Sequence, residues 1–282
     1  MAPARRQRLG QHFLTRRSWV ERVVEAIAPL PGQRILEVGP GRGALTFPLL
    51  AAGASILAVE LDRVLTERLR AKKVPAGSLT VVEGDILRVD LRDLVGRHLP
   101  GKAGVRVVGN LPYSVASPAL RRLLPGSDLF SDWTVMVQRE VADRILASPG
   151  SRLFGVLTLL CQCRAVPRRL FDLPPSCFTP PPRVMSTLLH FASRPSPFDS
   201  STHETAFQRG VKAAFSSRRK MLKNTLQAAL RLPAAEADAA LRAAGLNPAD
   251  RPEQIPLEGY LELARHLVKE GKTLPPVVEG IL

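Results

Sequence analysis

Short runs of apolar and β-branched residues alternate with helical patterns through the first two thirds of this chain of 282 residues. These runs predict strands at residues 34–38, 55–60, 79–82, 105–109, 133–137 and, late in the chain, 183–191. The patterns that predict helices cover residues 19–28, 44–52, 63–71 and 139–147. Strands alternating with helices in this way predict an α/β fold, in which a mainly parallel sheet is covered on both faces.

The composition changes near Ala192, where a Ser- and Pro-rich stretch at 193–197 predicts a linker. Nearly every later pattern is helical, and the predicted helices cover residues 205–215, 219–230, 235–244 and 257–269. We therefore expect an α/β domain over residues 1–192, which opens with a basic segment over 1–17, and a small all-helical domain over 198–282.

The chain is strongly basic, with 40 Lys and Arg against 25 Asp and Glu and a net charge of +15. A surplus of this size attracts a polyanion, which is either nucleic acid or an anionic membrane face, unless it serves only solubility. We expect no membrane partner, because no run of 18 apolar residues exists. Without a signal-peptide pattern, and with three cysteines that form no partner cluster, a cytoplasmic protein with reduced thiols is expected. The five histidines lack metal-ligand spacing, so no metal is expected.

A glycine-rich turn over residues 37–43 follows the first predicted strand. Such a turn brings the backbone close to a ligand, and on its own it also fits a loose dinucleotide-binding pattern. Glu37, just before the turn, would repel a pyrophosphate but suit a cation. Glu60 ends the second strand, where a carboxylate can bind ribose hydroxyls, and Asp85 follows the third, where one can accept from an adenine amino group. Together these three acids predict S-adenosylmethionine as the ligand. The alternative is that they are ordinary acids at strand ends.

The fourth predicted strand ends in Asn110-Leu111-Pro112-Tyr113. Ligand chemistry in open parallel sheets occurs at this strand edge. The Asn110 side-chain oxygen and a carbonyl at Leu111 or Pro112 can accept both N–H groups of an exocyclic adenine amine, and Tyr113 offers a face for a flipped base. Phe178, before a proline run, is a second candidate for stacking. The alternative is a proline turn with a packed aromatic, together with a buried Phe178.

Several motifs together resemble the family of ribosomal RNA adenine dimethyltransferases. They occur in the family's order over about residues 5–225, and they are the segments 10–14, 37–46, 60–62, 84–85, 110–113, 137–142 and 178–186. The resemblance implies a Rossmann-like class I methyltransferase domain with a mainly parallel seven-stranded sheet and a helical C-terminal domain. It implies S-adenosylmethionine as the cofactor, with no metal.

The resemblance also implies a role for each matching residue. His12 and Leu14 would cap the cofactor above Gly39, Glu60 would hold the ribose, and Asp85 would hold the adenine ring. Asn110 would touch both the cofactor and the target amine, with Leu111 and Pro112 in the same turn, and Tyr113 and Phe178 would flank the flipped adenine. The family often has Asn after the tyrosine, where this chain has Ser114.

The segment 215–224 resembles the small-subunit members of the family. The implied substrate is a pair of adjacent adenines in a hairpin near the 3′ end of 16S rRNA, each dimethylated at N6, in the 30S subunit or its precursor during ribosome biogenesis. We expect a monomer. The stretch from Thr205 to Ala235 contains seven basic residues and no acid, and four of them are candidate RNA-binding residues: Arg218, Arg219, Lys220 and Lys223.

Other functions remain open on the sequence alone. A resistance methyltransferase that modifies 23S rRNA shares every catalytic motif. A DNA adenine methylase fits less well, because its turn usually has Pro where this chain has Leu111. A non-catalytic RNA-binding assembly or transcription factor on the same scaffold is the alternative from a different class.

Overall fold

The computed structural model describes residues 11–75, 77–101, 104–126, 128–217, 220–230 and 233–271. The chain divides into two compact units. The first, an α/β unit, contains Met1–Ala142 and Ala165–Arg194, and the second, a helical unit, contains Asp143–Arg164 and Pro195–Leu282.

The segment Asp143–Arg164 departs from the expected boundaries, because it interrupts the α/β unit and belongs to the helical one. Its helix α8 (Val156–Gln162) lies near the end of this segment. Phe154, Leu159 and Cys163 are buried in the same apolar cluster as Phe207 of the helical unit. Burial of these side chains determines which core the segment joins. Local sequence patterns do not predict this choice.

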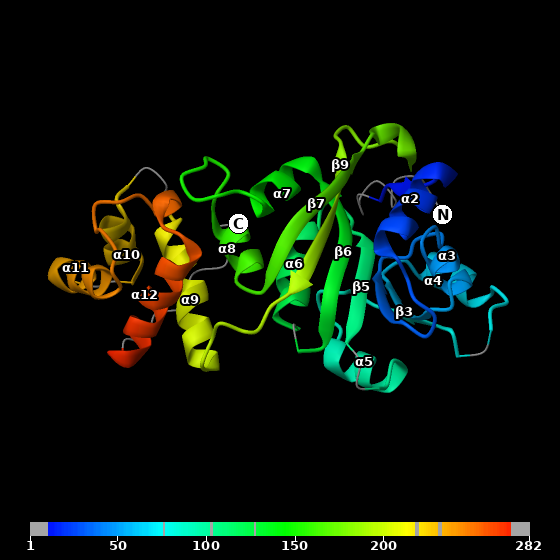
Figure 1. Ribbon diagram of the computed structural model, residues 1–282, viewed down its shortest axis with the longest axis horizontal. Coiled ribbons are helices and arrows are strands. Elements are labelled where there is room, and N and C mark those ends of the chain that lie inside the picture. The colour runs from blue at the N-terminus through cyan, green and yellow to red at the C-terminus, as the bar shows by residue number, and fades with distance from the viewer. Residues whose placement is uncertain are drawn as a thin grey trace. The chain divides into compact units, whose positions relative to one another are not determined.

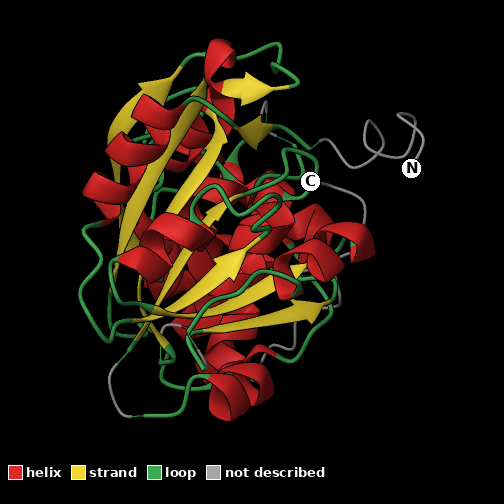
Figure 2. Cartoon of the chain, turned by 90° about the vertical axis from the view of Figure 1, so that its right-hand side faces the viewer, coloured by secondary structure: helices red, strands yellow, loops and turns green. Residues whose placement is uncertain are grey.

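A seven-stranded sheet forms the centre of the α/β unit, with strand order β4-β3-β2-β5-β6-β9-β7 (Figure 1). Its strands are β2 (Arg34–Val38), β3 (Ser55–Glu60), β4 (Leu79–Glu83), β5 (Val105–Asn110), β6 (Phe130–Gln138), β7 (Ala165–Leu173) and β9 (Ser186–Ser193). The first five in sequence run parallel, whereas β9 pairs antiparallel with both β6 and β7. The expected mainly parallel sheet of seven strands is confirmed, and the strands fan across one another with the usual twist (Figure 2).

The sequence patterns did not predict β7. It is an edge strand, paired only with β9, and it contains Pro167 and two consecutive arginines, Arg168 and Arg169. Its register with β9 shifts between Arg169 and Phe171. Proline and charged residues are tolerated at a sheet edge, where one side of the strand has no ladder to complete. The strand therefore lacks the nearly continuous apolar run that marks core strands such as β2 and β3.

Helices in the α/β unit follow the strands. They are α2 (Arg17–Ile27), α3 (Thr46–Ala51), α4 (Arg63–Arg70), α5 (Leu91–His98), α6 (Ala116–Leu123) and α7 (Arg139–Ile145), the last of which runs into the helical unit. The side chains of Asp62 and Asp90 accept hydrogen bonds from the first turns of α4 and α5 and so cap them. The sequence patterns missed α5 and α6, which have eight residues each and contain Gly96 and Pro118.

A second, two-stranded sheet joins distant parts of the chain. Strand β1 (Phe13–Leu14) pairs antiparallel with β8 (Phe178–Thr179), so that Leu14 lies opposite Phe178. Further bonds extend this pairing, since the N–H of Thr15 donates to the carbonyl of Cys177 at 2.9 Å. We call residues 11–16 the N-terminal strap, because this pairing fixes them across the sheet edge where β2 and β5 end.

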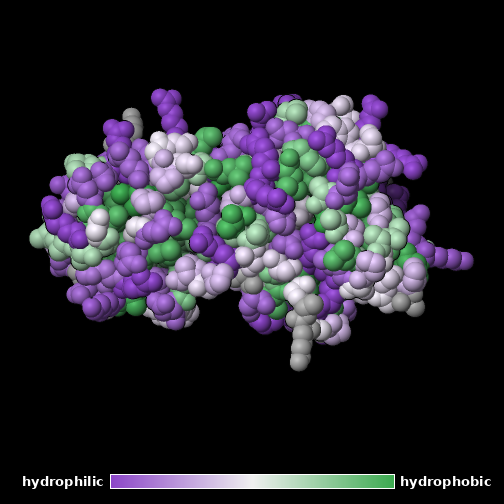
Figure 3. Space-filling model, in the orientation of Figure 1, coloured by the Kyte–Doolittle hydropathy of each residue, from purple (hydrophilic) through white to green (hydrophobic). Residues whose placement is uncertain are grey.

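The helical unit contains α8 and four longer helices, α9 (Ser201–Ala214), α10 (Leu222–Leu230), α11 (Ala234–Ala243) and α12 (Leu257–Lys269). Its core is built around Phe207, Leu241, Tyr260 and Leu263. No helix in the described part of the chain is long and apolar enough to cross a membrane. Hydrophilic side chains cover much of the face seen in Figure 3, with apolar ones scattered between them.

Candidate active site

The glycine-rich turn leaves β2 at Val38 and brings the backbone against two other segments. Gly39 and Gly41 have φ angles of 67° and 60°, which side-chain-bearing residues rarely adopt. A Cβ on Gly41 would lie 3.0 Å from the ring of Phe13, and one on Gly39 would lie 3.8 Å from the carbonyl oxygen of Asn110. Glycine at these positions therefore allows the strap and the end of β5 to approach the turn.

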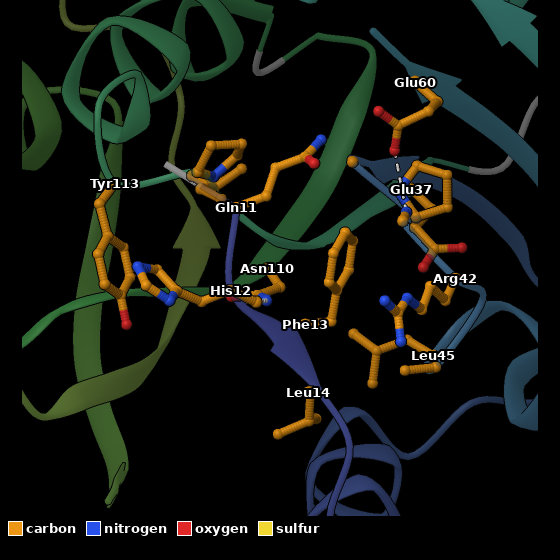
Figure 4. A pocket seen from close by; sticks show the side chains of 16 residues that line it. Gln11, His12, Phe13, Leu14, Glu37, Arg42, Leu45, Glu60, Asn110 and Tyr113 are labelled. Carbon is orange, nitrogen blue, oxygen red and sulfur yellow. Dashed lines mark hydrogen bonds between the residues drawn. The ribbon is translucent and has the colours of Figure 1, made fainter. Parts of the chain in front are cut away.

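Glu60, the last residue of β3, holds this turn in place. Its side chain is 3% exposed. One carboxylate oxygen accepts from the N–H of Gly41 at 2.9 Å, shown dashed in Figure 4, and the other accepts from the N–H of Asp62 at 2.9 Å. Burial raises the pKa of Glu60, while these two bonds oppose the rise. Because a carboxylate has about four acceptor positions, Glu60 can hold the loop and still accept from ligand hydroxyls.

Glu37, within β2, is more enclosed, at 2% exposure. Its Oε2 has no hydrogen-bond partner. Burial raises its pKa from 4.5 to about 7, the charge of Glu60 adds to the rise, and Thr46 opposes it. The full negative charge expected from the sequence is therefore about half present at neutral pH, because desolvation disfavours it.

The turn after β5 orients Asn110. Its amide nitrogen donates to the carbonyl oxygen of His12 at 2.7 Å, which leaves the side-chain oxygen to accept from a ligand. The carbonyl of Pro112 already accepts from the N–H of Val115 at 2.9 Å. Of the two carbonyls expected to accept from an amine, that of Leu111 is therefore better placed to do so.

Tyr113 is half-buried beside the strap. Its hydroxyl lies 2.6 Å from the hydroxyl oxygen of Ser186, and its ring centroid lies 5.1 Å from that of His12. Figure 4 shows these two rings side by side. Burial raises the pKa of Tyr113, so the phenol stays neutral. The sequence predicted neither the hydrogen bond of Tyr113 with Ser186 nor its ring contact with His12, because both depend on long-range packing.

The strap contributes the remaining wall. The Nδ1 of His12 lies 2.8 Å from the carbonyl oxygen of Pro180, which can only accept, so Nδ1 carries the proton. The guanidinium of Arg42 lies 4.7 Å from the ring centroid of Phe13. Figure 4 shows the two side chains next to each other. Neither Phe13 nor Arg42 was singled out from the sequence, although both lie inside the motifs that were.

Two adjoining pockets result, and Gln11, Gly39, Glu60, Leu111 and Pro112 line both. The first is lined by the strap, the glycine-rich turn and the turn after β5, and its further lining includes His12, Phe13, Leu14, Glu37, Arg42, Asn110 and Tyr113. The second has largely aliphatic walls, and its further lining includes Val38, Leu61, Asp85, Ile86, Ser114 and Ala119. The site residues expected from three strand ends and from the strap thus meet in one place.

Phe178 is the exception among the expected site residues. It is 3% exposed and packs in the core of the α/β unit beside Leu14 and Cys177. It lines neither of the two pockets, because its pairing with the strap turns the side chain inward. A stacking role for Phe178 stays a prediction that requires the strap to move.

The expected RNA-binding residues are only partly described. Arg218 and Arg219 lie outside the described residues, whereas Lys220 is exposed and Lys223 is half-buried at the start of α10. Among the residues that the structure describes, no group of three or more His, Cys, Asp or Glu side chains is placed to hold a metal ion.

This topology, with a glycine-rich turn and acids at three successive strand ends, defines a methyltransferase of the S-adenosylmethionine-dependent class. A model of the family described as ribosomal RNA adenine dimethylase matches residues 3–269. The chain belongs to this family.

Curated relatives agree with this assignment, and solved structures share the fold. The "Ribosomal RNA small subunit methyltransferase A" of Bordetella petrii is 43% identical over 94% of this chain and 96% of its own length. The protein of the same name from Xylella fastidiosa is 38% identical over 93% and 96%. A dimethyladenosine transferase from Plasmodium falciparum, at 20% identity, covers 94% of this chain and all of its own with a TM-score of 0.77. The 23S rRNA methyltransferase ErmE, at 23% identity, covers 91% and 99% with a TM-score of 0.65, and it too shares the fold.

Proposed function

We propose that this enzyme transfers methyl groups from S-adenosylmethionine to N6 of two adjacent adenines near the 3′ end of 16S rRNA, giving N6,N6-dimethyladenosine. The observation that carries the proposal is the meeting of the two pockets at the turn of Asn110, Leu111 and Pro112. One pocket suits a charged amino-acid end, the other suits a nucleoside, and the groups that can receive an adenine amine lie between them.

The residues present fit the cofactor. Aliphatic walls with Asp85 at their side suit an adenine ring, and Glu60 lies between the two pockets, where a ribose would lie. The buried Oε2 of Glu37, which has no partner, and the close backbone at Gly39 and Gly41 form a cradle for a cationic methionyl end. When bound, S-adenosylmethionine supplies an electrophilic methyl group.

The protein's own residues prepare the target amine. An adenine amine is a poor nucleophile, because its lone pair is delocalised into the ring. By accepting its two N–H groups, the Asn110 side-chain oxygen and the Leu111 carbonyl raise its electron density and aim it toward the first pocket. The bond from the Asn110 amide to His12 fixes the orientation of that oxygen. Tyr113, held by Ser186, supports the base.

The choice of RNA rests on the relatives. The relatives from Bordetella petrii and Xylella fastidiosa match at 43% and 38% identity over nearly their whole length. Both are named as small-subunit methyltransferases. The likeness to the 23S enzyme ErmE, at 23% identity, supports the fold alone. We therefore propose the 30S subunit or its precursor as the substrate. We also propose that the enzyme acts in the cytoplasm, in ribosome biogenesis, as a monomer.

Methyl transfer to 30S subunits, naked 16S rRNA and 23S rRNA, mapped by mass spectrometry, tests the proposal. We expect two dimethylated adenines in the 16S hairpin of the 30S subunits and none in 23S rRNA. Asn110→Ala serves as the inactive control. Modification confined to 23S rRNA would assign the resistance activity, and RNA binding without methylation would assign the non-catalytic role.

A further inference from the structure

Glu37 lines the pocket that would take the methionyl end of the cofactor, and it is almost fully buried. Its strand β2 lies between β3 and β5, and its partners in register are Ala58 and Val108, neither of which can carry charge. One carboxyl oxygen, Oε2, is buried with no hydrogen-bond partner, yet the residue lines the first pocket. Ionising a buried carboxyl group that has one unpaired oxygen is costly, so this site is incomplete while the pocket is free.

The charged and titratable groups facing this pocket do not compensate for a charge on Glu37. Glu60 is the nearest acid, and its negative charge disfavours ionisation of Glu37. Arg42 lines the same pocket with its guanidinium over the ring of Phe13. His12 also lines it, with Nδ1 committed to the carbonyl of Pro180. Thr46 favours the ionised form, but less strongly than burial opposes it.

A cofactor with a sulfonium and an ammonium group would reverse this balance, because a cation within about 4–6 Å of a carboxylate favours its charged form. We propose that Glu37 carries a proton in the cofactor-free protein and releases it to solvent when the cationic methionyl end binds, so that cofactor affinity is coupled to pH. The inference rests on the proposed use of S-adenosylmethionine. It makes Glu37 a residue that distinguishes the charged cofactor from its neutral thioether product.

The coupling has a defined direction and range. Burial raises the pKa of Glu37 to about 7 in the free protein, and a bound cation lowers it. Below about pH 7, binding must therefore remove a proton, and affinity weakens as pH falls. Above it the carboxylate is already ionised, and affinity levels off. With one proton linked, affinity should rise about tenfold between about pH 6 and about pH 8.

Isothermal titration calorimetry of the full chain with S-adenosylmethionine tests this coupling. Titrations at each pH in two buffers of different ionisation enthalpy give the number of protons released. We expect nearly one near pH 6 and nearly none near pH 8. S-adenosylhomocysteine, which lacks the sulfonium charge, should release fewer. Release of no protons near pH 6, or equal release with both ligands, would overturn the proposal.

Glu37→Gln keeps the shape of the side chain but cannot ionise. In this variant we expect no linked proton and an affinity that does not change with pH in this range. His12→Gln is the matched control, because the imidazole of His12 lines the same pocket. If His12→Gln abolished the release and Glu37→Gln kept it, the proton would belong to His12 and the assignment to Glu37 would be wrong.

Infrared difference spectra of the unmutated protein give a readout that needs no variant. Adding the cofactor near pH 6 should remove one protonated-carboxyl band and add one carboxylate band. No such exchange would overturn the proposal even if Glu37→Gln failed to fold. The proposed function is judged separately. Methylation without proton release would overturn this inference alone, and proton release without methylation of RNA would overturn the proposed function alone. Absence of cofactor binding would overturn both.

Discussion

Glu60 fixes the main chain of the site before any ligand arrives, since it bonds the N–H groups of Gly41 and Asp62. Asn110 likewise ties the strap to the end of β5 through the carbonyl of His12. A substitution at either position therefore removes both a proposed ligand contact and part of the framework that shapes the pocket. At Glu60 an isosteric variant keeps the shape of the side chain, and at Asn110 the rate is measured at saturating cofactor.

Glu60→Gln should weaken binding of S-adenosylmethionine by about 10- to 100-fold, because hydrogen bonds to a charged acceptor are worth about 1.5–3 kcal/mol. Glu83→Gln is the matched control, since Glu83 is the register partner of Glu60 on β4 but is exposed and lines neither pocket. Calorimetry measures both affinities. Equal affinities for the two variants would remove Glu60 from the cofactor site.

Asn110→Ala should lower the single-turnover rate at saturating cofactor by about 10²–10³, as the loss of an aimed electrostatic partner does. Tyr113→Ala should cost less, because a stacking face is worth about 1–3 kcal/mol per base. Tyr113→Phe keeps the ring and loses only the bond to Ser186, so its rate should stay near normal. A large loss in Tyr113→Phe would show that the hydroxyl, not the ring, matters.

Glu37 should also give the cofactor-free protein a pH-dependent stability. Its pKa rises from 4.5 to about 7 on folding, so between these values the folded chain binds more protons than the unfolded chain, and stability falls as pH rises. Above about pH 7 the loss amounts to about 3 kcal/mol. Urea denaturation should show Glu37→Gln gaining stability relative to the unmutated protein between about pH 5 and about pH 8. A constant difference would contradict this.

Helix α4 begins next to Glu60, and its cap is linked to that residue. The Asp62 side chain accepts from the first turn of α4 while its own N–H donates to Glu60. Asp90 caps α5 in the same manner, and neither Asp62 nor Asp90 lines either pocket. The two helices thus offer a matched pair in which the same chemistry is placed near the site and away from it.

Asp62→Ala and Asp90→Ala should each destabilise the fold by about 1 kcal/mol, the usual cost of losing an N-cap. Only Asp62→Ala should also weaken cofactor binding, because fraying of α4 releases the N–H that orients Glu60. Thermal denaturation and cofactor titration of both variants measure the two effects. Equal loss of affinity in Asp90→Ala would mean that general destabilisation, not local geometry, is responsible.

We predict that the net charge of +15 serves RNA binding rather than the pocket. Replacing Arg218, Arg219 and Lys220 with Gln should flatten the dependence of log affinity for 30S subunits on log salt by about two to three units, at 0.7–0.9 per phosphate contact. Cofactor affinity should not change. Filter binding over a range of salt concentrations measures the slope.

Arg92→Gln combined with Arg97→Gln is the control for this experiment. Both arginines are exposed and paired with acids, Asp128 and Asp93, so removing them changes the net charge without removing a basic run. Their salt dependence should match that of the unmutated protein. If the triple variant also kept its slope, the basic run would serve packing or solubility, and the RNA path would lie elsewhere.

The amino-acid sequence by itself determined what local physics can encode. Apolar β-branched runs predicted the core strands β2 and β3 at their observed bounds, because a strand buried on both faces must be apolar throughout. The parallel arrangement then required Glu60, Asp85 and Asn110 to gather at one edge of the sheet. The resemblance of segment 215–224 to the small-subunit members added the choice of RNA, which neither periodicity nor composition contains.

Only the tertiary structure decided which distant segments touch. The pairing of Leu14 with Phe178, the transfer of Asp143–Arg164 to the helical unit and the edge strand β7 all depend on contacts far apart in the chain. The same is true of Glu37, whose burial beside Glu60 turns an expected charge into a group that titrates near neutrality. A carboxyl group's pKa reports its surroundings, and those surroundings exist only once the chain has folded.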